Sequence, residues 1–536
     1  MTAGALYQIK NLNTNSENNF LDYDPQITFF KVVYRKHTRF ACENLQFDPF
    51  NRQSLDLENT VTLKCNAPRL GDLLSQVYFT FDLPDIYSGK YDDTSNGENY
   101  EFQWIKNIGL NIFNYISIKI SDQEIERMYS DYMVIWRELM MTDERKSIYN
   151  QQIGNIPELY DPANGPGMNG RYPHITTSDT SANQSLKWRN QTSNIITFSQ
   201  KTENTLPSII GRKIRVPLLF WFCNDPGLAL PLIALQYSVV SFEMEMKAFK
   251  DLYTIKDVNS GNINTDTTVD TSFGKRIKPS NNSIYLMNNF SSNYSYNINP
   301  RLEAEYIFLD DDERRRFAIN DHDYLITQSR ITEKFGIEIP HTIEETKAKL
   351  VPAFNPVSFI TWVVKRNDFQ HVNDWNNYTN WVYEDVPPYS YENELREMKF
   401  NTVGNASLFY NKNVTTHKAK FKLESLKKHV LTDVRIEFDG TDRVNKKAEY
   451  FSQQQVYQHF KTNPKSGIYV YSFSLSPKEY QPTGSCNFSL INYPRIYFKR
   501  DILENFSFYS HRAYIFIVSY NILSISNGIG STRFTN

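Results

Sequence analysis

The densest group of side chains that could do acid–base chemistry is the run Asp310, Asp311, Asp312 and Glu313. Two carboxylates held across a cleft, about 5–9.5 Å apart, can hydrolyse a glycosidic bond. Consecutive acids at the start of a helix more often stabilise the positive end of its dipole. Three arginines follow this run, so we expect residues 310–320 to form a short helix with an acidic first turn.

His322, between Asp321 and Asp323, is a second possible base, because a neighbouring carboxylate can raise the pKa of an imidazole. A surface turn explains the same three residues, and we favour it. The sequence contains no GxxxxGK[ST], GxSxG or HExxH motif. The nine histidines never lie two or four residues apart. We therefore predict no catalytic residue, no cofactor and no structural metal site.

The densest basic run consists of Lys418, Lys420, Lys422, Lys427 and Lys428. It could contact phosphate or an acidic partner, but lysines also protect exposed strand edges from unwanted pairing, which is the reading we prefer. The whole chain has 58 Lys and Arg against 60 Asp and Glu. This balance argues against a protein that coats nucleic acid, which needs a strong positive field.

An aromatic stretch in the second half could stack on sugar rings. Its members are Trp362, Trp375, Tyr378, Trp381 and Tyr383. Packing of these rings within the protein is the alternative, and we prefer it, because a sugar site also needs converging polar groups in a concave surface.

The elements that must position these residues are mainly strands. The 536 residues suggest two large domains, and 15% are aromatic, with 35 Tyr and 36 Phe. Aromatic and β-branched residues favour strands. In the first half we expect strands at 27–34, 60–65, 76–81, 112–120, 215–222 and 232–246. In the second half we expect them at 304–309, 359–364, 434–438, 468–475, 495–498 and 513–525.

Helices are expected only at 130–141 and 310–320. Long polar segments separate the strands, at 85–101, 142–211, 251–300 and 367–417, and loops of this length are usually functional or decorative. The third of these segments is the expected domain boundary. Many short strands without alternating helices favour two β-sandwiches or barrels over a parallel α/β sheet.

Two further features bound the class of protein. Residues 214–235 are apolar but contain Arg215 and three prolines, so we expect two buried strands and a turn here, not a membrane-spanning helix. The four cysteines lie far apart without a CxxC pair, which is typical of a protein that folds in a reducing compartment.

Five groups of residues, in order along the chain, together resemble one family. They are DPQITFFKVVYRKHTRFA at 24–41, WFCNDPGLALPLIALQY at 221–237, YIFLDDDERRRF at 306–317 with HDYL at 322–325, the set FDGTDR at 438–443, IYVYSF at 468–473 and QPTGSCNFS at 481–489, and YNIL at 520–523 with GIG at 528–530. Together they resemble the major capsid proteins of nucleocytoplasmic large DNA viruses.

The resemblance implies an all-β fold of two consecutive eight-stranded antiparallel jelly rolls, with long decorated loops and a few short helices. We divide the chain into an N-terminal arm (1–24), a first jelly roll (25–250), a linker (251–300), and a second jelly roll with a C-terminal tail (301–536). The departures from the family pattern are local, such as Val444 where the family commonly has Phe.

The resemblance also implies the partners. A homotrimer with a six-fold-like outline would contact neighbouring capsomers, minor capsid and penton proteins, near an internal membrane and without direct contact with nucleic acid. The protein would assemble in the host cytoplasm and reside in the virion shell. The segments 142–211 and 367–417 would face outward, and the arm inward. The alternatives are a minor capsid or scaffolding paralogue and, from another class, a carbohydrate-binding or carbohydrate-active β-sandwich.

Overall fold

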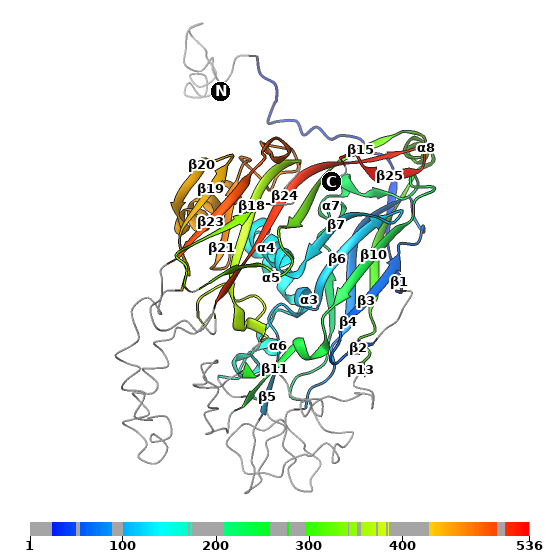
Figure 1. Cartoon of the computed structure of the whole chain (residues 1–536). Coiled ribbons are helices and arrows are strands. Elements are labelled where there is room, and N and C mark those ends of the chain that lie inside the picture. Colours follow the sequence, from blue (N-terminus) through cyan, green and yellow to red (C-terminus); the bar gives the residue numbers. More distant parts are fainter. Residues whose placement is uncertain are drawn as a thin grey trace, which may run out of the picture.

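The computed structural model describes residues 24–49, 54–87, 100–169, 172–173, 207–257, 276–277, 295–340, 342–350, 355–370, 373–381, 384, 428–500 and 510–534. Figure 1 shows two β-rich bodies side by side, the first mainly blue to green and the second mainly yellow-green to red. Helices α4 (Ser130–Met140) and α5 (Asp143–Gln152) lie near the junction of the two bodies.

The first body is built from eight main strands in two sheets. In chain order they are β1 (Phe40–Phe47), β3 (Val61–Asn66), β4 (Leu73–Asp82), β6 (Phe113–Ile120), β7 (Gln123–Tyr129), β8 (Lys213–Pro217), β10 (Val240–Met246) and β14 (Arg301–Leu309). One sheet has the order β1-β14-β4-β8 and the other has the order β3-β10-β6-β7. All of these pairings are antiparallel.

The second body has eight corresponding strands. They are β15 (His322–Ile331), β17 (Glu345–Lys349), β18 (Pro356–Arg366), β19 (Leu431–Phe438), β20 (Thr441–Lys447), β21 (Ile468–Ser472), β23 (Pro494–Arg500) and β24 (His511–Ser526). The orders are β15-β24-β18-β21 and β17-β23-β19-β20, again antiparallel throughout.

The two bodies share one topology. When the main strands of each are counted from first to eighth, both bodies have sheets in the order 1-8-3-6 and 2-7-4-5. Two four-stranded sheets with long crossings between them form an eight-stranded jelly roll. The expected all-β double jelly roll is therefore confirmed.

The expected domain boundary at residue 300 is wrong in one respect. Strand β14, which we assigned to the second jelly roll, pairs with both β1 and β4 and is the eighth strand of the first. The expected linker also contains β11 (Tyr253–Asp257), which pairs with β5 (Tyr100–Trp104). The sequence predicted a strand at 304–309 but a polar linker, not a strand, at 253–257. In both cases the strand's partner depends on contacts distant in sequence.

Alternation along the strands builds the cores. In β10 the burial alternates residue by residue, with Val240, Phe242, Met244 and Met246 inside and the two glutamates between them partly exposed. This is the pattern of a sheet with one face on a core. Strand β24 differs, because twelve of its sixteen residues are buried, including the unbroken run 513–521. It pairs with β15 and β18 along its sides, and Phe516 packs on Tyr132 of the first body.

Shorter elements complete the two bodies. The remaining strands are β2 (Leu55–Asp56), β9 (Leu230–Pro231), β12 (Arg276–Ile277), β13 (Ser295–Tyr296), β16 (Ile337–Ile339), β22 (Cys486–Asn487) and β25 (Ile529–Thr532). The remaining helices and helical turns are α3 (Ile108–Asn111), α6 (Pro157–Tyr160), α7 (Trp221–Asn224), α8 (Asp311–Ile319), η1 (Pro162–Asn164), η3 (Pro226–Leu228), η4 (Phe249–Asp251), η6 (Asn367–Gln370), η8 (Tyr450–Gln454), η9 (Val456–Phe460) and η10 (Phe488–Leu490).

Both expected helices are confirmed, as α4 and α8. The structure adds α5 and the helical turns η8 and η9, which we did not predict. Part of the segment 142–211, expected to be an outward decoration, is thus a helix packed on the body through Lys146 and Tyr149. Most of the rest of that segment, and most of 367–417, lies outside the described residues.

The strand expected at 27–34 is wrong, because residues 24–39 form no strand and every one of them is exposed. The N-terminal arm predicted at 1–24 lies outside the described residues except for Asp24. From here on we call the exposed residues 24–39 the arm; Figure 1 shows them crossing one end of the molecule and leading away from the body. The stretch 214–235 contains β8, α7 and β9 instead of two strands and a turn. No helix in the described ranges is long and apolar enough to cross a membrane.

Candidate functional site

The structure assigns ordinary structural roles to the acidic run. The side chain of Asp310 accepts a hydrogen bond from the backbone N–H of Glu313 at 2.9 Å, which caps the N-terminus of α8. Asp311, Asp312 and Glu313 fill the first turn, as the dipole interpretation predicts. The carboxylate of Asp72 lies next to this turn, where it accepts from the backbone N–H of Leu309 at 2.9 Å and pairs with Arg314 at 3.0 Å, so it also has a structural role.

His322 begins strand β15 instead of lying in a turn. Its Nε2 lies 2.8 Å from the carbonyl oxygen of Phe317, and its ring stacks on that of Phe317 at 5.1 Å. The neighbouring carboxylate of Asp323 is hydrogen-bonded by Ser524 and by Arg533. His322 therefore links α8 to β15, and these contacts give it no substrate-facing role.

The aromatic stretch is mostly interior. Trp362 is fully buried between the rings of Phe451 and Tyr469, and Tyr378 is 2% exposed. Trp375 is partly buried, and its indole N–H donates to the carbonyl of Asp251 at 2.9 Å. Packing, not sugar binding, explains these rings; Tyr383 lies outside the described residues.

The basic run is described only at its last member. The Nζ of Lys428 lies 5.0 Å from the ring centre of Trp381, a cation–π contact. Lys418, Lys420, Lys422 and Lys427 lie outside the described residues, so the preferred edge-strand reading stays a prediction.

A glycine spacing at 165–170 (GPGMNG) matches the pattern of dinucleotide-binding loops. Such a loop must follow a strand and open a helix. Here Gly165 follows the helical turn η1, and the residues up to 169 form turns. The spacing is therefore not such a loop. Within the described ranges, no three His, Cys, Asp or Glu side chains gather as a metal site would require.

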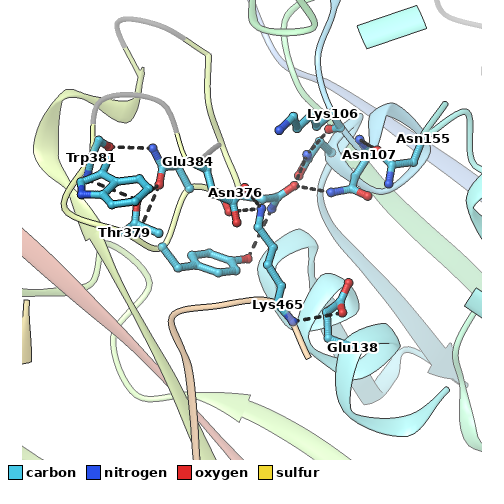
Figure 2. Close-up of polar contacts among 12 residues, drawn as sticks. Lys106, Asn107, Glu138, Asn155, Asn376, Thr379, Trp381, Glu384 and Lys465 are labelled. Atoms are coloured by element: carbon cyan, nitrogen blue, oxygen red, sulfur yellow. Dashed lines mark hydrogen bonds and ion pairs between the residues drawn. The ribbon is translucent and has the colours of Figure 1, made fainter. Parts of the chain in front are cut away.

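The richest polar cluster lies where the two jelly rolls meet. Its centre is Asn376, whose Oδ1 accepts from Asn107 at 3.0 Å and from Asn111 at 2.6 Å, all three being buried (Figure 2). Asn107 precedes α3 in the left-handed backbone region, with φ of 53°, which asparagine adopts more readily than most residues. Two amides at α3 and one from a segment about 270 residues away thus join the bodies.

A charged layer continues this cluster. Figure 2 shows Lys465 of the second body between Asn376 and Glu138 of α4. The Nζ of Lys465 donates to the carbonyl of Asn376 at 2.8 Å and pairs with Glu384, while its backbone N–H donates to Glu138 at 3.2 Å. Burial raises the pKa of Glu138, but Arg137 and Lys146 outweigh it, so the net shift is downward. Glu138 is therefore ionised and holds both bodies.

A second ion pair crosses the junction at Asp131. Its Oδ1 lies 2.6 Å from the Nζ of Lys365 and accepts from the hydroxyl of Tyr378 at 3.3 Å. The Lys365 side chain is only 2% exposed, and its ammonium lies near the rings of Phe369 and Tyr514, at 4.8 and 5.2 Å. Desolvation makes such a pair costly to break.

Strands β7 and β15 complete the junction edge to edge. Gln328 of β15 donates to the carbonyl of Ile125 at 2.5 Å, and Ser329 donates to that of Arg127 at 3.4 Å. Glu126 is buried here, and desolvation raises its pKa well above the ordinary value, partly offset by a hydrogen bond from the Ser329 backbone. The junction therefore joins the two bodies by buried polar contacts that nothing in the sequence distinguished from surface residues.

Exposed apolar residues mark the surfaces. On the arm, Phe29 is 87% and Phe30 99% exposed, and Ile27, Val32, Val33 and Tyr34 are all similarly exposed. A further group surrounds the C-terminal hairpin β24–β25, with Tyr237, Ile529 and Phe534 exposed. Exposed apolar residues concentrated in this way indicate interaction surfaces.

Two jelly rolls in tandem, joined by buried polar contacts, place the chain in the class of double jelly-roll proteins. A family model described as major capsid protein N-terminus matches residues 28–310, and one described as large eukaryotic DNA virus major capsid protein matches residues 313–531. The chain belongs to this family of major capsid proteins of large eukaryotic DNA viruses.

Comparisons with individual proteins support the same family. The chain is 27% identical to the major capsid protein of Phaeocystis pouchetii virus, over all of both chains, and 26% identical to that of Chrysochromulina ericina virus, over 96% and 97%. A capsid structure of the virus PBCV-1 has a TM-score of 0.58 with 21% identity, covering 95% of this chain and 100% of that one. This last likeness concerns the fold.

Proposed function

We propose that this chain is the major capsid protein of a large DNA virus and that it forms homotrimers which tile an icosahedral shell. The observation that carries the proposal is the repeated strand order of the two jelly rolls, together with family membership across both. Three copies of two similar bodies give a block with a six-fold-like outline. Such a block can sit among identical neighbours on a flat face.

The junction supports this role. A capsid building block needs a fixed angle between its two jelly rolls, because variation in that angle would change the shape of the trimer and prevent regular packing. The amide cluster at Asn376 and the buried pair Asp131–Lys365 hold that angle through groups buried away from water. The family match to major capsid proteins and the fold do not favour a minor or scaffolding paralogue. A carbohydrate-binding function is not favoured, because Trp362 and Tyr378, which were to stack on sugar rings, are buried in the core.

We assign the arm and the apolar surface around β24–β25 to the inward side of the shell, facing minor capsid and penton proteins close to an internal membrane. Both lie at the same end of the molecule in Figure 1. The segments 142–211 and 367–417, which lie mostly outside the described residues, are assigned to the outward side. The proposal includes assembly in the host cytoplasm, and it includes no catalytic step, no cofactor and no contact with nucleic acid.

The solution mass of the purified protein tests the trimer. Light scattering should give three times the chain mass of 62.9 kDa, and an obligate interface of this kind should bury more than about 2,000 Å². In purified particles the chain should dominate the protein mass. A stable monomer under assembly conditions, or absence from particles, would contradict the proposal.

Truncation tests the arm. Removing residues 1–39 should leave the trimer intact, because the described arm residues pack on neither core, but should lower the yield of closed particles. A full yield of normal particles from the truncated chain would exclude the inward role.

A further inference from the structure

We propose that the trimer closes by contact between strand β20 of one copy and strand β1 of the next, in the manner in which β7 meets β15 within one chain. This inference rests on the proposed trimer and names the surface that forms it.

The internal repeat carries the argument. Within the chain, the two bodies meet through the fifth strand of the first, β7, and the first strand of the second, β15. The fifth strand of the second body is β20, and the first strand of the first body is β1. Repeating the same step once more therefore brings β20 against β1. Because β1 belongs to the same chain's first body, this contact must be made with another copy.

The burial of side chains on the four strands fits this repeated contact, because the pair that meets within one chain contains buried residues and the other pair does not. In β7, Ile125 and Met128 are each 3% exposed, and in β15 Ile326 is 1% exposed. Strands β1 and β20, by contrast, contain no buried residue, and β20 is exposed at every position except Val444, which is partly buried. Each of these two also ends its sheet. Leu45 and Phe47 of β1 and Val444 of β20 pack partly on the cores, and the other residues of both strands are exposed. An edge strand with so little cover is a template for pairing.

The positions of the two strands exclude a contact within one copy and favour a ring. Figure 1 shows β20 at one side of the molecule and β1 at the opposite side. A head-to-tail contact between different surfaces closes into a ring when its rotation fits a whole number of copies. With two bodies of like topology in each chain, three copies supply six.

The charges are complementary. Lys446 and Lys447 are exposed on β20, while Glu43 is exposed on β1 and the partly exposed Glu305 of β14 lies opposite Asn44 of β1, on the other face of the sheet. Within the described part of the chain, none of these four side chains forms an ion pair. A copy-to-copy contact of β20 with β1 would bring the two signs together.

Chemical cross-linking tests the contact directly, because β1 carries a natural exposed thiol, Cys42. Asn445, Lys446 and Lys447 are each changed to Cys in turn, which samples both faces of β20, and the assembled protein is treated with a short bis-maleimide. We expect covalent species of two and three chains at one position at least. Adding Cys42→Ser to the same variant should abolish them.

Strand β17 supplies the matched control, because it is the other edge of the sheet that contains β20. Lys347→Cys and Lys349→Cys, both exposed, should give no cross-link to Cys42. The mass in solution is measured on every variant first. A trimer that cross-links at none of the three β20 positions, or equally from β17, overturns this contact and leaves the trimer standing. A monomer overturns the proposed function and this contact with it.

Discussion

The fifth and first strands of the jelly rolls form two comparable pairs, β7 with β15 and β20 with β1. The first pair contains buried residues and the second is largely exposed. Strands β7 and β15 face each other within the chain and bury apolar side chains and the carboxyl of Glu126. Strands β1 and β20 are bare, and β20 reads TDRVNKK. A contact formed during folding can use apolar side chains that would be unfavourable if they stayed exposed to water. A surface that pairs only later, between folded copies, must remain compatible with water until the second copy binds.

The largest expected effect is the loss of the junction's ion pair. Asp131→Ala leaves the buried ammonium of Lys365 without its carboxylate, and breaking a buried pair in this way costs about 3–5 kcal/mol. We expect denaturant unfolding at fixed protein concentration to show this loss. Asp311→Ala, which removes an exposed acid lying 4.0 Å from Arg314, is the control and should cost less than about 1 kcal/mol. Equal losses of unfolding free energy in the two variants would mean that the Asp131–Lys365 pair contributes no more than an exposed ion pair.

Removal of the central amide should be the next largest effect. Asn376→Ala leaves the buried amides of Asn107 and Asn111 without their shared acceptor, and an unsatisfied buried group costs about 1–3 kcal/mol. The same unfolding measurement applies, with Asn445→Ala on bare β20 as its partner. If the two alanine variants were equally stable, the amide cluster would not hold the bodies together.

The buried carboxyl on β7 should make the covered junction sensitive to pH. The folded chain retains the proton of Glu126 well above the ordinary pKa of 4.5, whereas the unfolded chain releases it near that value. The folded state therefore binds more protons above this pH, and its stability falls as the pH rises. Glu126→Gln should remove this dependence and raise stability at neutral pH. Identical slopes of unfolding free energy against pH in both proteins would contradict the assignment.

The smallest effect on the single chain belongs to the bare edge. Lys446→Glu with Lys447→Glu should change the free energy of unfolding by no more than about 0.5 kcal/mol, as is usual for surface substitutions. The same change should shift the trimer towards monomers at low protein concentration, seen in sedimentation. Adding Glu43→Lys should restore part of the association. A marked loss of stability in the isolated chain would show that this edge is already covered.

Much of the fold could be predicted from local patterns. The apolar and polar alternation at 112–120 and the acidic-to-basic order at 310–320 are complete within a few residues, and β6 and α8 follow from them. Helix α5 also had a local signal, Thr142 followed by Asp143 and Glu144, but its low apolar content made the segment resemble a loop.

What could not be predicted depends on partners distant in sequence. Residues 27–34 have the composition of a strand, yet a strand exists only where another segment supplies hydrogen bonds, and no other described segment pairs with them. Asn376 and Lys465 read as surface residues, because burial at the junction comes from contacts about 270 residues away for Asn376 and about 330 for Lys465. The family resemblance, not the pattern of these residues, gave the function.

The place of β14 has a consequence for synthesis. Its slot between β1 and β4 stays empty while the ribosome makes everything from Asp82 to Arg301, because the strand that fills it comes last. Throughout that time β1 lacks its only strand partner and β4 lacks one of its neighbours. Unpaired strand edges of this kind are prone to aggregate. The first jelly roll therefore cannot be completed until residue 309 has left the exit tunnel.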